Sequence, residues 1–215
     1  LGYRLVAVVA LAMAFTFFVT LPRWKNGSED RGNTVREKTP FGETLRTPRV
    51  WLSISLFFLH TGAEITLGSW AYTLLTESRG VDATLAGLWA GSFWFMFTVG
   101  RILAGVYTRL VKTHTLVRVC LFLAMGGALL LAWNPFPWVS LLGVALCGFA
   151  IAPIYPAMIS GTAARVGQRH AVNTIGMQVG SAGMGGAVIP ALAGVLAQNI
   201  SLETIPLYLA GLFAL

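Results

Sequence analysis

Long apolar runs alternate with short polar connections along most of this 215-residue chain. A helix needs about 20 mostly apolar residues to cross the hydrocarbon of a bilayer. Runs of about that length lie at residues 2–21, 50–75, 83–106, 116–133, 138–160 and 171–197, and a shorter run starts at residue 204. None of them shows the strict apolar–polar alternation of a membrane β-strand. The pattern therefore predicts an all-α membrane protein, a polytopic helical bundle.

The composition agrees with a membrane location. Hydrophobic residues make up 56% of the chain and charged residues 11%, whereas a soluble domain carries roughly a quarter charged residues. So little polar surface cannot cover a water-soluble fold of this length. The composition thus excludes an ordinary soluble domain.

The basic residues predict the orientation, because cytoplasmic loops collect Lys and Arg. The long polar stretch 22–49 carries Arg23, Lys25, Arg31, Arg36, Lys38, Arg46 and Arg49. We therefore expect loop 22–49 to be cytoplasmic, with Arg101 and Arg109 marking the same inner face, in a plasma membrane or, in a bacterium, the inner membrane. The net charge of +7 then reflects topology and contact with anionic membrane lipid, and we expect no nucleic-acid partner.

Loop 22–49 also divides the chain. It is too polar to form a core of its own, so we expect a flexible linker, with room for a short amphipathic helix. The run after residue 204 is too short to cross a membrane, so both ends of the chain look cut. We expect residues 1–21 to be the last helix of an N-terminal half that is otherwise missing, and residues 50–215 to be a six-helix half with a truncated last helix.

Glu64 is the only carboxylate inside a long apolar run, and His60 precedes it by one helical turn. An ionisable residue at bilayer depth is unfavourable and usually marks an ion or substrate path. The spacing places both residues on one helix face together with Thr61. We interpret Glu64 and His60 as ion-coupling candidates and Thr61 as a solute-binding candidate. The alternative is a structural role, with Glu64 bonded to a neighbouring helix.

Four further positions could contact a polar solute. Gln178 and Ser181 share a helix face, where amides and hydroxyls could bind solute hydroxyls or act as ordinary interhelical contacts. Tyr155 lies between prolines in APIYPAM, where a disturbed helix could present its hydroxyl to a cavity. Trp89 is the first of several aromatic residues along one helix face. This face could contact a sugar ring or simply pack in the core.

The apolar runs contain no metal-ligand cluster, no paired aspartates and no nucleophile motif. We therefore expect no catalytic residue, no bound metal and no cofactor beyond a coupling ion, H⁺ or Na⁺. The chain is not expected to be an enzyme.

Four segments resemble one known family: HTGAEITLGSW, VGRILAG, GFAIAPIYPAMIS and GSAGMGGAVIPALAG. They are similar to the seventh, eighth, tenth and eleventh helices of major facilitator superfamily transporters, most of all the branch of fucose permease and related sugar symporters. Over essentially its whole length the chain resembles helices six to twelve of that fold. One motif departs from the family: Ala104 and Thr108 stand where the loop after the eighth helix often has Gly and Asp, although Arg109 matches.

The resemblance implies two six-helix halves that rock about a central site. It implies a secondary active transporter that moves a small-molecule solute, such as a sugar or related metabolite, together with a proton or sodium ion. An efflux carrier for apolar or cationic compounds remains open within the same superfamily. A seven-helix receptor is a remote alternative, because the count of seven arises from truncation.

Overall fold

The computed structural model describes residues 2–29 and 39–215, and their regular structure is helical. The chain divides into two units, with the boundary after Lys38. Each unit is described by itself below.

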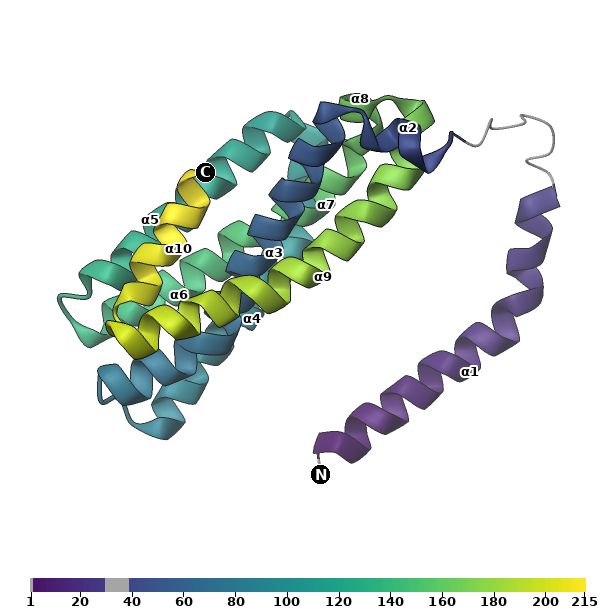
Figure 1. The fold of residues 1–215 in the computed structure, drawn as a ribbon. Helices are drawn as coiled ribbons and strands as arrows, with labels where there is room; N and C mark the ends of the chain where they lie inside the picture. The colour runs from purple at the N-terminus through teal and green to yellow at the C-terminus, as the bar shows by residue number, and fades with distance from the viewer. Residues whose placement is uncertain (1, 30–38) are drawn as a thin grey trace. The chain divides into compact units, whose positions relative to one another are not determined.

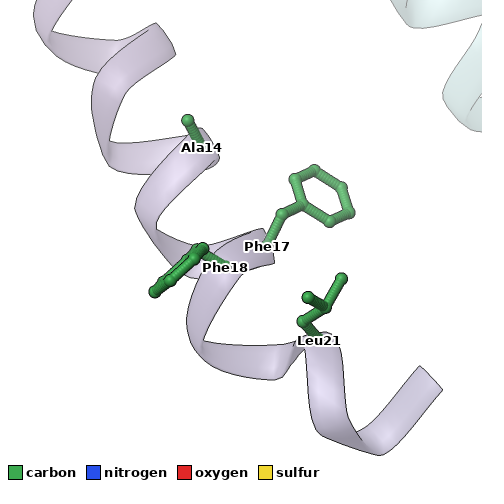
Figure 2. Close-up of a pocket in the computed structure, with 4 residues that line it drawn as sticks. All are labelled: Ala14, Phe17, Phe18 and Leu21. Atoms are coloured by element: carbon green, nitrogen blue, oxygen red, sulfur yellow. The ribbon is translucent and has the colours of Figure 1, made fainter. Parts of the chain in front are cut away.

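The first unit contains helix α1 (Gly2–Glu29). Its apolar part runs from Val6 to Pro22 and is shorter than the candidate membrane spans of the second unit. Ala14, Phe17, Phe18 and Leu21 line a shallow pocket on this helix (Figure 2). The pocket therefore presents an apolar surface of the kind that contacts lipid or another helix.

The helix does not end at residue 21, where the predicted cytoplasmic loop begins. Pro22 lies inside α1, which continues to Glu29. Proline removes one backbone donor and usually kinks a helix, but the Arg23, Trp24 and Lys25 that follow can all continue a helical turn. The helix therefore continues past the predicted boundary, whereas its apolar part ends at Pro22; the cytoplasmic placement of loop 22–49 stays a prediction. Residues 30–38 of that loop lie outside the described part of the chain.

The second unit is a helical bundle (Figure 1). Its elements are α2 (Phe41–Leu45), α3 (Pro48–Thr73), the π-helical turn η1 (Leu74–Ser78), α4 (Ala83–Leu110), α5 (Thr113–Trp133), α6 (Pro137–Ile151), α7 (Ile154–Ser160), α8 (Thr162–Val166), α9 (Gln168–Asn199) and α10 (Thr204–Ala214).

Five helical segments of this unit are long and apolar enough to cross a membrane. They are Pro48–Ser78, Ala83–Val106, Thr113–Trp133, Pro137–Ser160 and Gln168–Asn199. Each matches a predicted run to within a few residues. The predicted short run is the shorter apolar helix Thr204–Ala214.

Close helix pairs build the bundle. Helix α3 packs mainly against α9, and α6 packs against both α4 and α5; Figure 1 shows α9 running alongside α3. The α3–α9 contact is close because glycine lies in it: a methyl group at Gly185 would overlap the carbonyl oxygen of Phe58, and one at Gly62 would overlap the Ile189 side chain. Small residues allow such backbone approach between membrane helices.

The fourth of these spans is broken. Helix α6 ends at Ile151 and α7 begins at Ile154, with Pro153 before it. Proline disfavours helix in the preceding residue and lacks the N–H of the helical ladder. The disturbed helix predicted around Tyr155 is therefore present in the structure.

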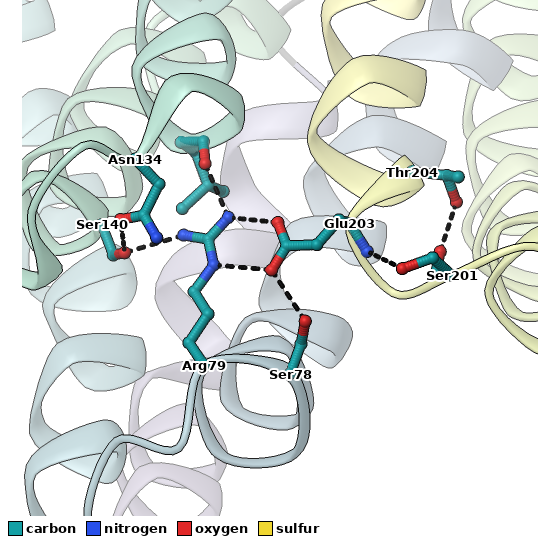
Figure 3. Close-up of polar contacts among 8 residues, drawn as sticks. Ser78, Arg79, Asn134, Ser140, Ser201, Glu203 and Thr204 are labelled. Atoms are coloured by element: carbon teal, nitrogen blue, oxygen red, sulfur yellow. Dashed lines mark hydrogen bonds and ion pairs between the residues drawn. The ribbon is translucent and has the colours of Figure 1, made fainter.

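A polar cluster around Arg79 joins four elements where η1, α5, α6 and α10 meet (Figure 3). The Arg79 guanidinium donates to both carboxylate oxygens of Glu203, to Ser140 Oγ at 2.7 Å and to the Leu131 carbonyl oxygen at 2.7 Å. Ser78 Oγ donates to Glu203 Oε1 at 2.7 Å. Arginine suits this position because its planar fork holds a carboxylate at two points.

Candidate functional site

The candidate site lies halfway along the first span of the bundle. Glu64 is sixteen residues after Pro48 and fourteen before Ser78 in that span. His60 is buried, and its Nε2 atom lies 3.8 Å from Glu64 Oε2. That distance is within ion-pair range but too long for a hydrogen bond. The two residues therefore share one electrostatic environment without a direct bond.

Several buried polar atoms at this site have no hydrogen-bond partner among the described residues. His60 Nδ1, His60 Nε2 and Thr61 Oγ1 are buried, and none of them hydrogen-bonds to a described residue. Nearly all buried polar atoms in native proteins are hydrogen-bonded, and an unpaired one costs about 1–3 kcal/mol. Three such atoms on two consecutive residues mark a place suited to a polar solute, an ion or water.

Aromatic residues lie beside His60. The ring centroids of His60 and Tyr155 are 6.4 Å apart, and the Phe57 ring meets the Tyr155 ring edge-on at 4.9 Å. Tyr155 is half-buried and follows the break between α6 and α7. The broken helix thus brings Tyr155 next to His60 on α3.

Arg101, predicted to mark the inner face, lies in α4 beside Phe97. It lies five residues before the end of the apolar span at Val106, and its guanidinium carbon is 4.7 Å from the Phe97 ring centroid. Arg101 therefore packs on an aromatic ring towards the end of its span, and its place on the inner face stays a prediction.

Gln178 and Ser181 face α3 from α9. Gln178 is fully buried; its Nε2 donates to Ser53 Oγ at 2.5 Å, and its Oε1 accepts from Thr162 Oγ1 at 3.1 Å. Ser181 Oγ donates to the Ile54 carbonyl oxygen at 2.9 Å. These groups link α3, α8 and α9 in this structure, and their role in solute binding stays a prediction.

Two other predicted positions lie in α4. Trp89 is half-buried, and its carbonyl oxygen accepts a hydrogen bond from Ser92 Oγ at 2.6 Å. Trp89 lies twelve residues before Arg101 on this helix, about 18 Å along its axis. Arg109 is in the last turn of α4, and its side chain lies outside the described residues.

Arg165, which is not among the predicted site residues, takes part in the packing. Its Nη2 donates to the Met158 carbonyl oxygen and, at 3.3 Å, to Thr162 Oγ1. Its Nε is buried and bonds to no described residue. Thr162 lies three residues earlier in the same helix, but Met158 lies in α7, so the contact with Met158 depends on the turn between α7 and α8.

At the same end of the bundle, α2 is attached to the start of α9. Asn173 Nδ2 donates to the Thr39 carbonyl oxygen and to Thr44 Oγ1, both at 3.1 Å. Arg169 Nη1 lies 3.2 Å from Glu43 Oε1. The part of the linker that the structure describes thus contains a short helix, which is fixed to the bundle.

In the described ranges 2–29 and 39–215, no three His, Cys, Asp or Glu side chains are grouped to hold a metal ion.

Comparison with known sequences places these features in a family. The sequence model of the Major Facilitator Superfamily matches residues 2–190. A protein of Saccharomyces cerevisiae, "Bypass of stop codon protein 6", is 34% identical over 199 residues, which cover 85% of this chain and 40% of the yeast protein. The chain therefore spans less than half the length of that relative.

Proposed function

Because this chain belongs to the major facilitator superfamily, we propose that it is the C-terminal part of a secondary active transporter for a small polar solute. The chain is an all-α integral membrane protein with several spans. The proposal rests above all on the buried, unpartnered polar atoms of His60 and Thr61 beside Glu64. A transport site must offer such groups to a solute and release them again.

In this proposal Glu64 binds and releases the coupling proton. A carboxyl group at mid-span is stable when neutral and attracts a positive ion when charged. His60, 3.8 Å away, can pass a proton to Glu64 or bind the solute. Sodium is the alternative coupling ion.

The proposed solute is a sugar or a related metabolite. Thr61 and Tyr155 offer hydroxyls near His60, and the Phe57 and Tyr155 rings offer flat apolar faces. Trp89, Gln178 and Ser181 are further proposed contacts, reached if the helices rearrange between inward-open and outward-open states. The partner half of the cavity would come from the N-terminal half of the same protein, in the plasma membrane.

Uptake by the full-length protein in vesicles tests the proposal. Labelled sugars and other small metabolites are offered with and without an inward proton gradient, and separately with a sodium gradient, to wild type and to Glu64→Gln. Glu77→Gln is the matched control, because it is the same substitution at an exposed position in η1. We expect one solute to accumulate with the gradient. Glu64→Gln should keep solute exchange but lose accumulation, and Glu77→Gln should behave as wild type.

Two results would count against this proposal. Normal accumulation by Glu64→Gln would remove the coupling role of Glu64. If no metabolite enters but apolar or cationic compounds leave vesicles against their gradient, the protein is an efflux carrier of the same superfamily, and the solute assignment is wrong.

A further inference from the structure

A pocket with two arginines lies at the end of the bundle that carries α2 and α8. It has a volume of about 350 Å³ and is lined by Arg49, Leu52, Ser53, Leu56, Ala164 and Arg165. Two positive side chains therefore line one cavity, and its described lining contains no carboxylate.

The two arginines have donors to offer. Arg49 is exposed in the first turn of α3 and pairs with no described residue. Arg165 Nη2 already donates hydrogen bonds to the Met158 carbonyl oxygen and to Thr162 Oγ1, but the buried Nε has no described acceptor. Burial lowers the pKa of the Arg165 guanidinium by removing water from it. A bound anion would restore part of the lost solvation.

Ser53 adds a hydroxyl to the wall of the pocket. Its oxygen accepts from Gln178 Nε2, so its own hydrogen is available to an incoming acceptor. The α3 N-terminus adds the positive end of a helix dipole close to Arg49. Three types of donor thus converge on the polar end of the pocket.

The rest of the lining is apolar. Leu52 and Leu56 are exposed and follow Arg49 by about one and two helical turns. Arg49 lies one residue after the start of the span at Pro48, the level at which lipid phosphates meet the hydrocarbon, and the two leucines lie deeper. A small hydrophilic anion would use only the polar end, whereas a phospholipid would fill both ends.

We propose that this pocket binds an anionic phospholipid of the leaflet next to loop 22–49. Its phosphate contacts Arg49, Arg165 and Ser53, and an acyl chain lies over Leu52 and Leu56. Basic pockets between membrane helices bind anionic headgroups in this way. The pocket lining does not include His60, Thr61 or Glu64, and the proposal does not depend on transport.

The test measures lipid binding to the full-length protein in detergent by native mass spectrometry, with phosphatidylserine and phosphatidylcholine titrated in parallel. We expect one phosphatidylserine to bind more tightly than phosphatidylcholine. Affinity for phosphatidylserine should fall about fivefold in Arg49→Gln and about 25-fold in Arg49→Gln/Arg165→Gln. Arg118→Gln is the matched control, because Arg118 is also exposed near the start of a spanning helix.

Arg165 also supports local packing, so the exposed Arg49 position gives the cleaner result. Wild-type affinity in Arg49→Gln would overturn the proposal, as would an equal loss in Arg118→Gln, which would show general surface attraction. Displacement of the lipid by glycerol 3-phosphate, with no effect of Leu52→Ser/Leu56→Ser, would assign the pocket to a soluble phosphate and also overturn it. Loss of phosphatidylserine binding in the leucine variant would support it.

Discussion

Arg79 and Glu203, 124 residues apart in the sequence, form a two-point ion pair with Nε 3.0 Å from Oε1 and Nη2 2.6 Å from Oε2. The Arg79 side chain is 6% exposed and that of Glu203 42%. Because Arg79 also donates to Ser140 and to the Leu131 carbonyl oxygen, the pair fixes η1 and α10 against α5 and α6. Because the Arg79 charge is nearly buried, removing its partner costs more than breaking an exposed salt bridge.

Glu203→Gln should therefore destabilise the bundle. It leaves the guanidinium of Arg79 without its charged acceptor, and we expect a loss of about 1.5–3 kcal/mol, the range for hydrogen bonds to charged groups. Arg79→Lys should also destabilise, because an ammonium group cannot bind a carboxylate at two points. Thermal unfolding of the purified full-length protein measures both. Glu77→Gln, at an exposed position, should leave the melting temperature unchanged, and an equal fall there would refute the special role of Glu203.

The same pair predicts a dependence of stability on acid. Hydrogen bonds from Arg79 are the main cause that lowers the pKa of Glu203 below its usual value of 4.5. Its contribution is therefore complete above about pH 4.5 and is lost as the pH falls further and the carboxylate takes up a proton. Melting temperatures of wild type and Glu203→Gln between pH 7 and pH 3 should converge at the acid end. Curves that stay parallel would contradict the prediction.

Gly185→Ala should disrupt the α3–α9 contact. The added methyl group would overlap the carbonyl oxygen of Phe58, a backbone atom that cannot move aside without shifting α3. We expect a loss of about 1–3 kcal/mol, as for other overpacked sites. Gly180→Ala is the control on the same helix, since no described atom lies within 4 Å of its added carbon. Yield of folded protein and melting temperature should fall for Gly185→Ala only.

Gln178→Leu tests whether this amide holds helices together or binds solute. Removing it breaks the bonds to Ser53 and Thr162, and at about 0.6 kcal/mol for each interhelical bond we expect a loss of about 1 kcal/mol. If Gln178 serves packing alone, the KM for solute should stay unchanged in the folded fraction. A large rise in KM with an unchanged melting temperature would instead assign Gln178 to the solute site.

His60→Leu should separate stability from function at the proposed transport site. The change removes two buried nitrogen atoms that have no described partner, so the melting temperature should stay the same or rise. Accumulation of solute should be lost, because the group beside Glu64 is gone. A marked fall in melting temperature would show that His60 is a structural residue, and normal accumulation would exclude it from coupling.

The five bundle spans could be predicted from the sequence to within a few residues. Whether a segment of 20 residues is stable in lipid depends mostly on its own side chains, so the information is local. The isolation of Glu64 and its spacing from His60 are local in the same sense. The apolar part of the first helix also ends close to the predicted position, at Pro22, but the continuation of the helix to Glu29 could not be predicted from hydropathy.

The contacts between helices could not be predicted this way. Gln178 and Ser181 were recognised as a polar helix face, yet only the packing of α9 on α3 shows that they contact Ser53 and the Ile54 carbonyl oxygen. Likewise, only the positions of the neighbouring helices show that the buried polar atoms of His60 and Thr61 have no described hydrogen-bond partner. The roles of these residues in transport stay predictions.

By itself, then, the sequence determined a membrane-spanning helical chain with one acidic residue in the middle of a span, because the transfer of each segment into lipid is set by that segment's own composition. Only the tertiary structure decided that Arg79 meets Glu203, that Arg165 lines a pocket with Arg49, and that Tyr155 lies beside His60. These pairs depend on which helices pack together and on how far each helix is shifted along its neighbour. Both are set by the sum of many small contacts along each interface.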